Sequence, residues 1–271
     1  MAGGVLRQQV AQVLKDAAKD WTVTPSMNEM NDLLRLMCKW RQYALVETFF
    51  VRQGGGVIYS GPFKGMNYLD RASEGALLPR LLGTYEDELH PHIERLAEMG
   101  LDCVIDVGCA EGYYAVGLAL RMPAVTVYAH DIDPRAHEGC AQLAAQNGVS
   151  DRVEIGGEFA PEDFQRFAGR RALVMVDTEG AEVAILDPDR GPALKDMWII
   201  VETHDGITPG ARETLTKRFE ASHDILQLDP GPKDPDMPWW LKELGHLDQL
   251  LAVWEWRSFP TPWLVMTPKS A

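Results

Sequence analysis

The chain has 271 residues, which is enough for one full α/β domain with a smaller appendage. It carries a formal net charge of −14 and no run of basic residues, which argues against a nucleic acid as partner, because phosphate backbones are held by clustered Lys and Arg. The acidic balance also disfavours an anionic membrane, so we expect a small-molecule substrate, no nucleic acid and no membrane partner.

The first hundred residues are typical of helices joined by a short extended region. Ser26 and Glu29 have the Ser-x-x-Glu spacing of a capping box, which marks the start of a long amphipathic helix. We therefore predict an N-terminal cap over residues 1–100. Its expected elements are helices over residues 5–19, from Ser26 to the glycines at 54–56, and over 85–99, with a small hairpin or paired extended segments at 56–59 and 66–69.

From residue 102 onward, short apolar segments alternate with helical ones. This alternation predicts a mostly parallel sheet covered by helices on both sides, in a domain over residues 101–271. The expected strands are residues 104–107, 125–129, 152–155, 172–176, 198–201, 225–228 and 263–266. The C-terminal extension is rich in tryptophan, and such residues serve in a core, in a homodimer contact or as a stacking surface.

The cysteine spacing, the polar N-terminus and the length of the apolar runs indicate in which cellular compartment the protein is expected. The four cysteines form no CxxC pair and have no metal-ligand spacing. The N-terminus is too polar for a signal peptide, and no apolar run approaches the ~20 residues that span a bilayer. We expect a cytoplasmic protein.

The sharpest local feature is the turn after the first strand of the alternating region, Asp106-x-Gly108-x-x-x-Gly112. Gly108 permits a tight turn, and Gly112 allows backbone and ligand to approach where a Cβ would intrude. The spacing differs from the G-x-G-x-x-G of dinucleotide enzymes, whose helix N-terminus holds a pyrophosphate. An acid at the strand end, Asp106, suits instead the ammonium group of an aminoacyl sulfonium ligand.

A second acid follows at the end of the next strand, about 20 residues beyond the glycine turn. Asp131 is placed there to accept both hydroxyls of a ribose, whereas Asp133 is better explained as the cap of the next helix. After the third strand, Glu158 and Phe159 are candidates for the exocyclic amine and the ring of an adenine. The full expected cofactor-binding set is Asp106, Gly108, Cys109, Gly112, Tyr113, Asp131, Ile132, Glu158, Phe159 and Asp177.

At these residues the chain resembles class I S-adenosylmethionine-dependent methyltransferases. More narrowly it resembles the FkbM-like group, through Asp177-Thr-Glu179-Gly-Ala-Glu182 and Glu202-Thr-His204, which look like its D-x-E-G-x-E and E-x-H elements. The resemblance implies a doubly wound, mostly parallel, seven-stranded Rossmann-like sheet with S-adenosylmethionine as cofactor. It also implies O-methylation of a small-molecule or sugar hydroxyl.

The candidate catalytic residues lie at or just after strand ends, where an open parallel sheet binds its ligand. His204 is the histidine in this cluster and is expected to act as general base, with Asp177 and Glu202 beside it. A metal-assisted alternative places Mg²⁺ on Asp177, Glu202 and either His204 or Asp205, where the ion would lower the pKa of an acceptor hydroxyl. In a third alternative the protein only positions the reactants.

Other functions stay open on the same architecture. An N-methyltransferase would use the same cofactor site with a different acceptor. A nicotinamide-dependent oxidoreductase is disfavoured by the glycine spacing, and a non-catalytic cofactor-binding protein would keep the turn but transfer nothing.

Overall fold

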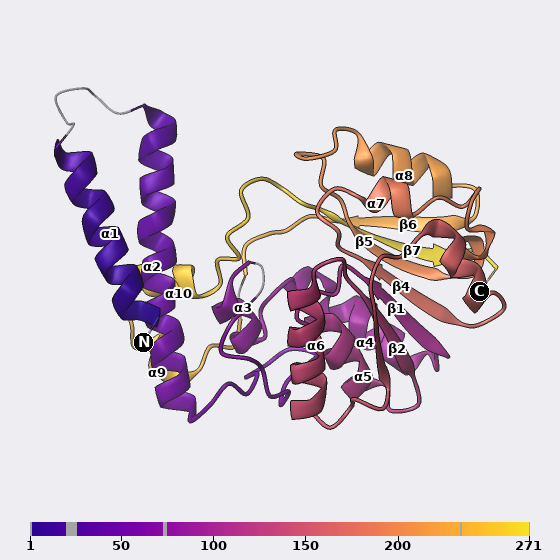
Figure 1. The fold of residues 1–271 in the computed structure, drawn as a ribbon, viewed down its shortest axis with the longest axis horizontal. Coiled ribbons are helices and arrows are strands. Elements are labelled where there is room, and N and C mark those ends of the chain that lie inside the picture. Colours follow the sequence, from indigo (N-terminus) through magenta and orange to yellow (C-terminus); the bar gives the residue numbers. More distant parts are fainter. Residues whose placement is uncertain (1, 20–25, 73–74, 234, 271) are drawn as a thin grey trace.

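The computed structural model describes residues 2–19, 26–72, 75–233 and 235–270, and Figure 1 shows its course. A helical hairpin stands beside an α/β body that contains a seven-stranded sheet. None of the described helices is long and apolar enough to cross a membrane.

The sheet has the order β3-β2-β1-β4-β5-β7-β6. All neighbouring strands are parallel except β7, which pairs antiparallel with both β5 and β6. The strands are β1 Cys103–Val107, β2 Thr126–His130, β3 Val153–Gly156, β4 Ala172–Val176, β5 Trp198–Glu202, β6 His223–Leu228 and β7 Trp263–Pro268. Every one of the seven strands predicted from the sequence is therefore present, and the doubly wound, mostly parallel α/β fold is confirmed.

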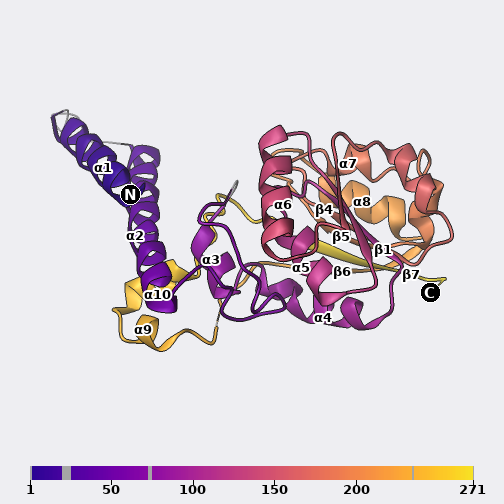
Figure 2. The ribbon, with the colours of Figure 1, turned by 60° about the horizontal axis from the view of Figure 1, so that its bottom comes forward.

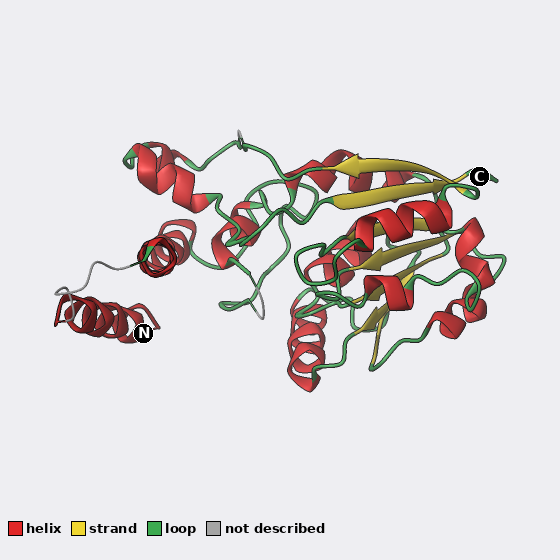
Figure 3. Cartoon of the chain, turned by 90° about the horizontal axis from the view of Figure 1, so that it is seen from above, coloured by secondary structure: helices red, strands yellow, loops and turns green. Residues whose placement is uncertain are grey.

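The central strands are buried on both faces because each face carries its own apolar layer (Figure 3). Neighbouring residues of β1 point to opposite sides: Val104 joins the core beneath α5, and Ile105 joins the core that contains Phe219 of α8. Because β1, β2, β3, β4 and β5 run parallel, the residues that follow their carboxyl ends lie at one edge of the sheet. The helices of the body are α4 His90–Glu98, α5 Tyr113–Arg121, α6 Pro134–Gln146, α7 Glu182–Ile185 and α8 Ala211–Phe219, with 3₁₀ turns at Asp87–Leu89, Pro161–Phe167 and Pro192–Asp196.

The hairpin consists of α1 Ala2–Lys19 and α2 Met27–Gln53, as the sequence predicts. Ser26 caps α2 through the predicted box: its hydroxyl accepts from the backbone N–H of Glu29, and the Glu29 carboxylate accepts from the backbone N–H of Ser26. The expected hairpin after α2 is reduced to a single antiparallel bridge between Val57 and Asn67.

The C-terminal extension returns to the hairpin, as Figure 2 shows. Its short helices, α9 Trp239–Lys242 and α10 His246–Ala252, lie against α2. Gln42 donates to the carbonyls of Leu251 and Trp254 at 2.6 and 2.7 Å. The C-terminal extension therefore packs against the N-terminal helical hairpin.

Segment 75–101 connects the hairpin to the sheet. It contains α3 Leu77–Leu82, which the sequence did not predict, and the predicted helix over 85–99 is present only from His90. One apolar core includes Phe49 of α2, Leu78 of α3 and Leu118 of α5. The division at residue 100 stays a prediction, and the apolar core crosses it.

Candidate active site

The glycine turn after β1 is held in a conformation that only glycine fits. Gly108 has φ +87°, and a Cβ there would lie 1.7 Å from the backbone oxygen of Asp177. Gly112 has φ +92°, and its Cβ would lie 2.8 Å from Sγ of Cys140. The backbone N–H groups of Gly108 and Cys109 both donate to the carbonyl of His130, at 2.8 and 3.0 Å. The turn is thus fixed between the ends of β2 and β4.

Asp106 ends β1 and lines a cavity that we call the inner cavity. Its side chain is buried, and its Oδ2 has no hydrogen-bond partner among the described residues. Burial and the nearby charge of Asp131 raise the pKa of Asp106 to about 7. A buried carboxylate oxygen of this kind needs a cationic or donor group from a ligand. The inner cavity is lined by Arg80, Tyr85, Asp106, Gly108, Cys109, Ala110, Glu111, Tyr113, Tyr114, Met175, Asp177 and Trp263.

Asp131 lies on the other side of the same turn, in a second space that we call the lateral cavity. Its Oδ2 accepts from the backbone N–H of Ala110 at 3.0 Å, and its Oδ1 accepts from that of Asp133 at 2.8 Å. Both bonds fix the carboxylate across the turn. Asp133 itself caps α6 through the backbone N–H of Arg135, which confirms its predicted structural role.

The lateral cavity meets the inner cavity at Gly108, which lines both. Its wall includes an apolar pair suited to a flat ring: Ile132, which is 83% exposed, and Phe159, which is buried against the His130 ring. Glu158 is exposed at the same rim. The predicted cofactor residues therefore surround two joined cavities, with a carboxylate that can accept hydrogen bonds in each and apolar faces in the lateral one.

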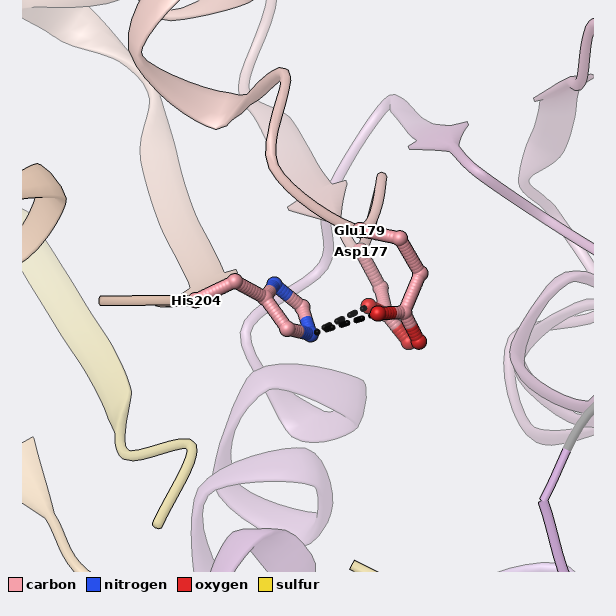
Figure 4. Close-up of side chains that lie close together, drawn as sticks. All are labelled: Asp177, Glu179 and His204. Carbon is pink, nitrogen blue, oxygen red and sulfur yellow. Dashed lines mark ion pairs between the residues drawn. The ribbon is translucent and has the colours of Figure 1, made fainter. Parts of the chain in front are cut away.

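The predicted catalytic residues lie together at the ends of β4 and β5. Figure 4 shows His204 facing Asp177 and Glu179. Nε2 of His204 lies 3.8 Å from Oδ1 of Asp177, 3.4 Å from Oε2 of Glu179 and 3.2 Å from Oε2 of Glu202. Its Nδ1 lies 2.6 Å from Oε1 of Glu182, a buried carboxylate.

The neighbouring carboxylates determine the protonation state of His204. Burial alone would lower the pKa of the ring, but its hydrogen bonds with Glu182 and Glu202 raise the pKa to about 11. The ring is therefore an imidazolium at neutral pH, with no lone pair to accept a proton. The geometry argues against the predicted role of His204 as general base and favours a role as counter-ion for the carboxylates.

Glu202 is held from the opposite side by the C-terminal tail. Its Oε1 accepts from Arg257 and, at 2.6 Å, from the hydroxyl of Thr261. Burial raises the pKa of Glu202, but the bonds from His204 and Arg257 outweigh it and lower the pKa to about 2. Both oxygens of this carboxylate are thus already engaged by protein groups.

The predicted metal set is not the one that the structure brings together. Among the described residues, the group whose ligand atoms lie within 4.8 Å of one another is Asp177, Glu179 and His204. Glu202 is engaged as described, and Asp205 lies outside this group. Since His204 is ion-paired with carboxylates through both nitrogens, the arrangement is that of a charge network.

Asp177 occupies the junction between the inner cavity and a third space, the front cavity. Its Oδ1 makes no hydrogen bond to a described residue. Burial and the charges of Glu202 and Glu86 raise the pKa of Asp177 well above its usual range. The front cavity is lined by Lys39, Gly75, Arg80, Tyr85, Ala110, Asp177, Glu179, Glu202, His204, Ile207, Glu255, Trp256, Arg257, Ser258, Phe259 and Thr261.

Arg257, a tail residue that no sequence motif indicated, closes this site. Arg257 donates to Glu86, Glu202 and Glu255 and so joins the segment before α4, the end of β5 and the tail. No motif surrounds it, and its partners are far away in the sequence. Backbone strain is a further sign: within the described chain, the non-glycine residues with positive φ are Glu86, Ala110, Glu179 and Trp256, and all four lie at this site.

No family model matches the chain. It is 33% identical over 128 residues to the ribosomal protein L11 methyltransferase of Psychrobacter arcticus, covering 47% of this chain and 40% of that protein. It is 42% identical over 130 residues to the ribosomal protein L11 methyltransferase of Acinetobacter baylyi, covering 46% of this chain and 41% of that protein. The chain thus spans about two fifths of the length of these curated relatives.

Two solved structures have a similar fold. One is an O-methyltransferase from Bacillus cereus in complex with SAH, at 12% identity and a TM-score of 0.44, covering 66% of this chain and 81% of that one. The other is an rRNA methylase from Streptococcus thermophilus, at 15% identity and a TM-score of 0.44, covering 67% of this chain and 96% of that one.

The prediction of a small-molecule partner and no nucleic acid is wrong. The curated relatives are named as methyltransferases of a ribosomal protein, which is a macromolecule and not a small molecule. The error came from the net charge, which describes the whole surface and not the patch that meets a partner. The FkbM-like resemblance finds no match among these names. The chain is thus a relative of class I S-adenosylmethionine-dependent methyltransferases, whose seven-stranded Rossmann-like sheet it has.

Proposed function

We propose that the chain is an S-adenosylmethionine-dependent methyltransferase that uses the inner and lateral cavities as its cofactor site. The observation that carries the proposal is the pair Asp106 and Asp131, which flank one glycine turn from two cavities that meet at Gly108. In this proposal Asp106 binds the ammonium group, Asp131 binds the ribose hydroxyls, and Ile132 and Phe159 cover the adenine. The cofactor supplies a methyl group that is already activated by the sulfonium.

The proposed proton acceptor is Asp177. It lines the two cavities between which a methyl group would pass, and its Oδ1 makes no hydrogen bond to a described residue. Burial and the charges of Glu202 and Glu86 raise the pKa of Asp177, so that its ionised form is a stronger base than an ordinary carboxylate. His204 is then a positioning residue that balances the charges of Glu182 and Glu202. A bound Mg²⁺ is not part of the proposal.

We propose an amine on a basic protein as the acceptor, so the reaction is an N-methylation. Asp177 and Glu179, whose side chains are 27% and 56% exposed, present carboxylates to the front cavity, which favours a cationic group. The cations Arg80, Arg257 and His204 in that cavity are paired with buried carboxylates, and Lys39 lies over the Trp256 ring. The names of the curated relatives support a ribosomal protein as the acceptor.

The experiment is transfer of a tritiated methyl group from S-adenosylmethionine to bacterial ribosomal subunits, followed by separation of protein from rRNA. We expect the label in the protein fraction, on amino groups, and its loss in the Asp131→Ala variant. Label in the rRNA would overturn the amine acceptor and leave the transferase. No label in either fraction, from an enzyme that binds S-adenosylhomocysteine, would overturn the ribosomal acceptor.

A further inference from the structure

The inner cavity has an unusual balance of charge for a pocket that receives an amino acid group. Its ionisable lining consists of three carboxyl side chains, Asp106, Glu111 and Asp177, one guanidinium, that of Arg80, and tyrosines. The aminoacyl end of the proposed cofactor carries a carboxylate as well as an ammonium. A carboxylate buried among acids is costly unless a cation meets it.

The backbone of the glycine turn does not supply that partner. Four of its N–H groups are used within the protein: Gly108 and Cys109 donate to His130, Ala110 donates to Asp131, and Gly112 donates to Cys109. In turns that bind anions, such groups point at the ligand instead. A cationic side chain is therefore the better partner for the carboxylate, and Arg80 is the guanidinium in the lining.

Arg80 is held where it can serve both cavities. It belongs to α3, every residue of which is buried, and it lines the inner and the front cavity. Its guanidinium carbon lies 4.1 Å from the centroid of the Tyr85 ring, and its Nε lies 3.9 Å from Oε1 of Glu111. That carboxylate oxygen also accepts a hydrogen bond from the hydroxyl of Tyr68 at 2.5 Å. Aromatic stacking and this ion pair fix the plane of the guanidinium, and a planar fork suits a carboxylate.

We propose that Arg80 binds the carboxylate of the cofactor's methionine moiety, so that a segment before the sheet completes the cofactor site. This inference rests on the proposed function. In this inference α3 takes part in cofactor binding. The helix lies between the hairpin and the sheet, and its Arg80 supplies the positive charge that the glycine turn lacks. Removal of residues 1–100 would then remove half of the recognition of the aminoacyl group.

The test uses two ligands that differ only in this carboxylate, S-adenosylhomocysteine and its decarboxylated analogue, titrated by calorimetry into the full chain. The wild type should prefer the carboxylated ligand by roughly 10- to 100-fold, as a charged hydrogen-bonded pair predicts. Arg80→Met should remove the preference by weakening S-adenosylhomocysteine alone, and Arg80→Lys should keep part of it. Arg218→Met is the matched control, because Arg218 donates to the carbonyls of Val183 and Leu186 and lines none of the three cavities.

The outcomes separate the two claims. Equal affinity of the wild type for both ligands would overturn the inference without any variant, and so would a preference that survives Arg80→Met. If Arg80→Met does not fold, Arg80→Lys still decides, since a preference equal to that of the wild type would contradict a bidentate guanidinium. Failure of the wild type to bind either ligand would instead overturn the proposed function.

Discussion

Replacement of Asp177 by asparagine is expected to lower the rate of methyl transfer by about 10²- to 10⁴-fold, which is the usual contribution of a positioned proton acceptor. The amide keeps the shape of the side chain but cannot take a proton from the acceptor amine. Binding of S-adenosylhomocysteine should change little, because Asp106 and Asp131 are untouched. The measurement is a single-turnover rate with saturating labelled cofactor, together with the affinity for S-adenosylhomocysteine.

Glu179→Gln is the matched control for this prediction. Glu179 belongs to the same cluster, but its side chain is 56% exposed, and it lines the front and lateral cavities and not the inner one. We expect its loss to weaken acceptor binding and to leave the single-turnover rate within roughly tenfold of the wild type. A rate for Asp177→Asn equal to that of Glu179→Gln would contradict the assignment of Asp177.

Replacement of His204 by glutamine is expected to reduce the free energy of unfolding by about 3–5 kcal/mol, because it leaves Glu182 buried without its counter-ion, whereas Glu202 keeps Arg257. The pKa of His204 rises to about 11 in the folded chain, so its stabilisation is complete below the unfolded pKa of roughly 6.5 and declines as pH rises toward 11. The loss caused by the variant should therefore be largest near pH 6 and smaller at pH 9. Urea unfolding at several pH values measures it.

His223→Gln is the matched control, since His223 is equally buried but makes no ion pair with a carboxylate of the described residues. It contacts the carbonyl of Met197 at 2.8 Å and the hydroxyl of Ser222 at 2.9 Å, and burial lowers its pKa. A lowered pKa gives the opposite trend, with stability lost as pH falls through the unfolded value. A general-base role for His204 would be restored if His204→Gln folded as stably as the wild type and transferred methyl groups as slowly as Asp177→Asn.

The fold was predictable because its signals are local. Each strand is a short apolar segment, and the turn at Gly108 and the cap at Asp133 depend on neighbouring residues. By contrast α3 escaped prediction: its six residues are all buried and include a proline, so no polar face marks a helical period. Only packing against the body determines it.

The identity of the residues at the site was also predictable from the sequence, but their protonation states were not. The sequence placed Asp177, Glu202 and His204 at strand ends, where they are found. Whether His204 accepts or holds a proton depends on Glu182, which lies 22 residues away in the chain, and on Glu202. The state of Glu202 depends in turn on Arg257, 55 residues away. Such contacts form only when the chain folds, so no spacing rule reports them.

The most direct measurement of the central claim is a calorimetric titration of S-adenosylhomocysteine into the wild type and Asp131→Ala. We expect tight binding by the wild type and a loss of ~1.5–3 kcal/mol in the variant, because the ribose hydroxyls lose charged hydrogen bonds. Equal binding by the two would contradict the assigned position of the nucleoside. No binding by a folded wild type would contradict the methyltransferase assignment itself.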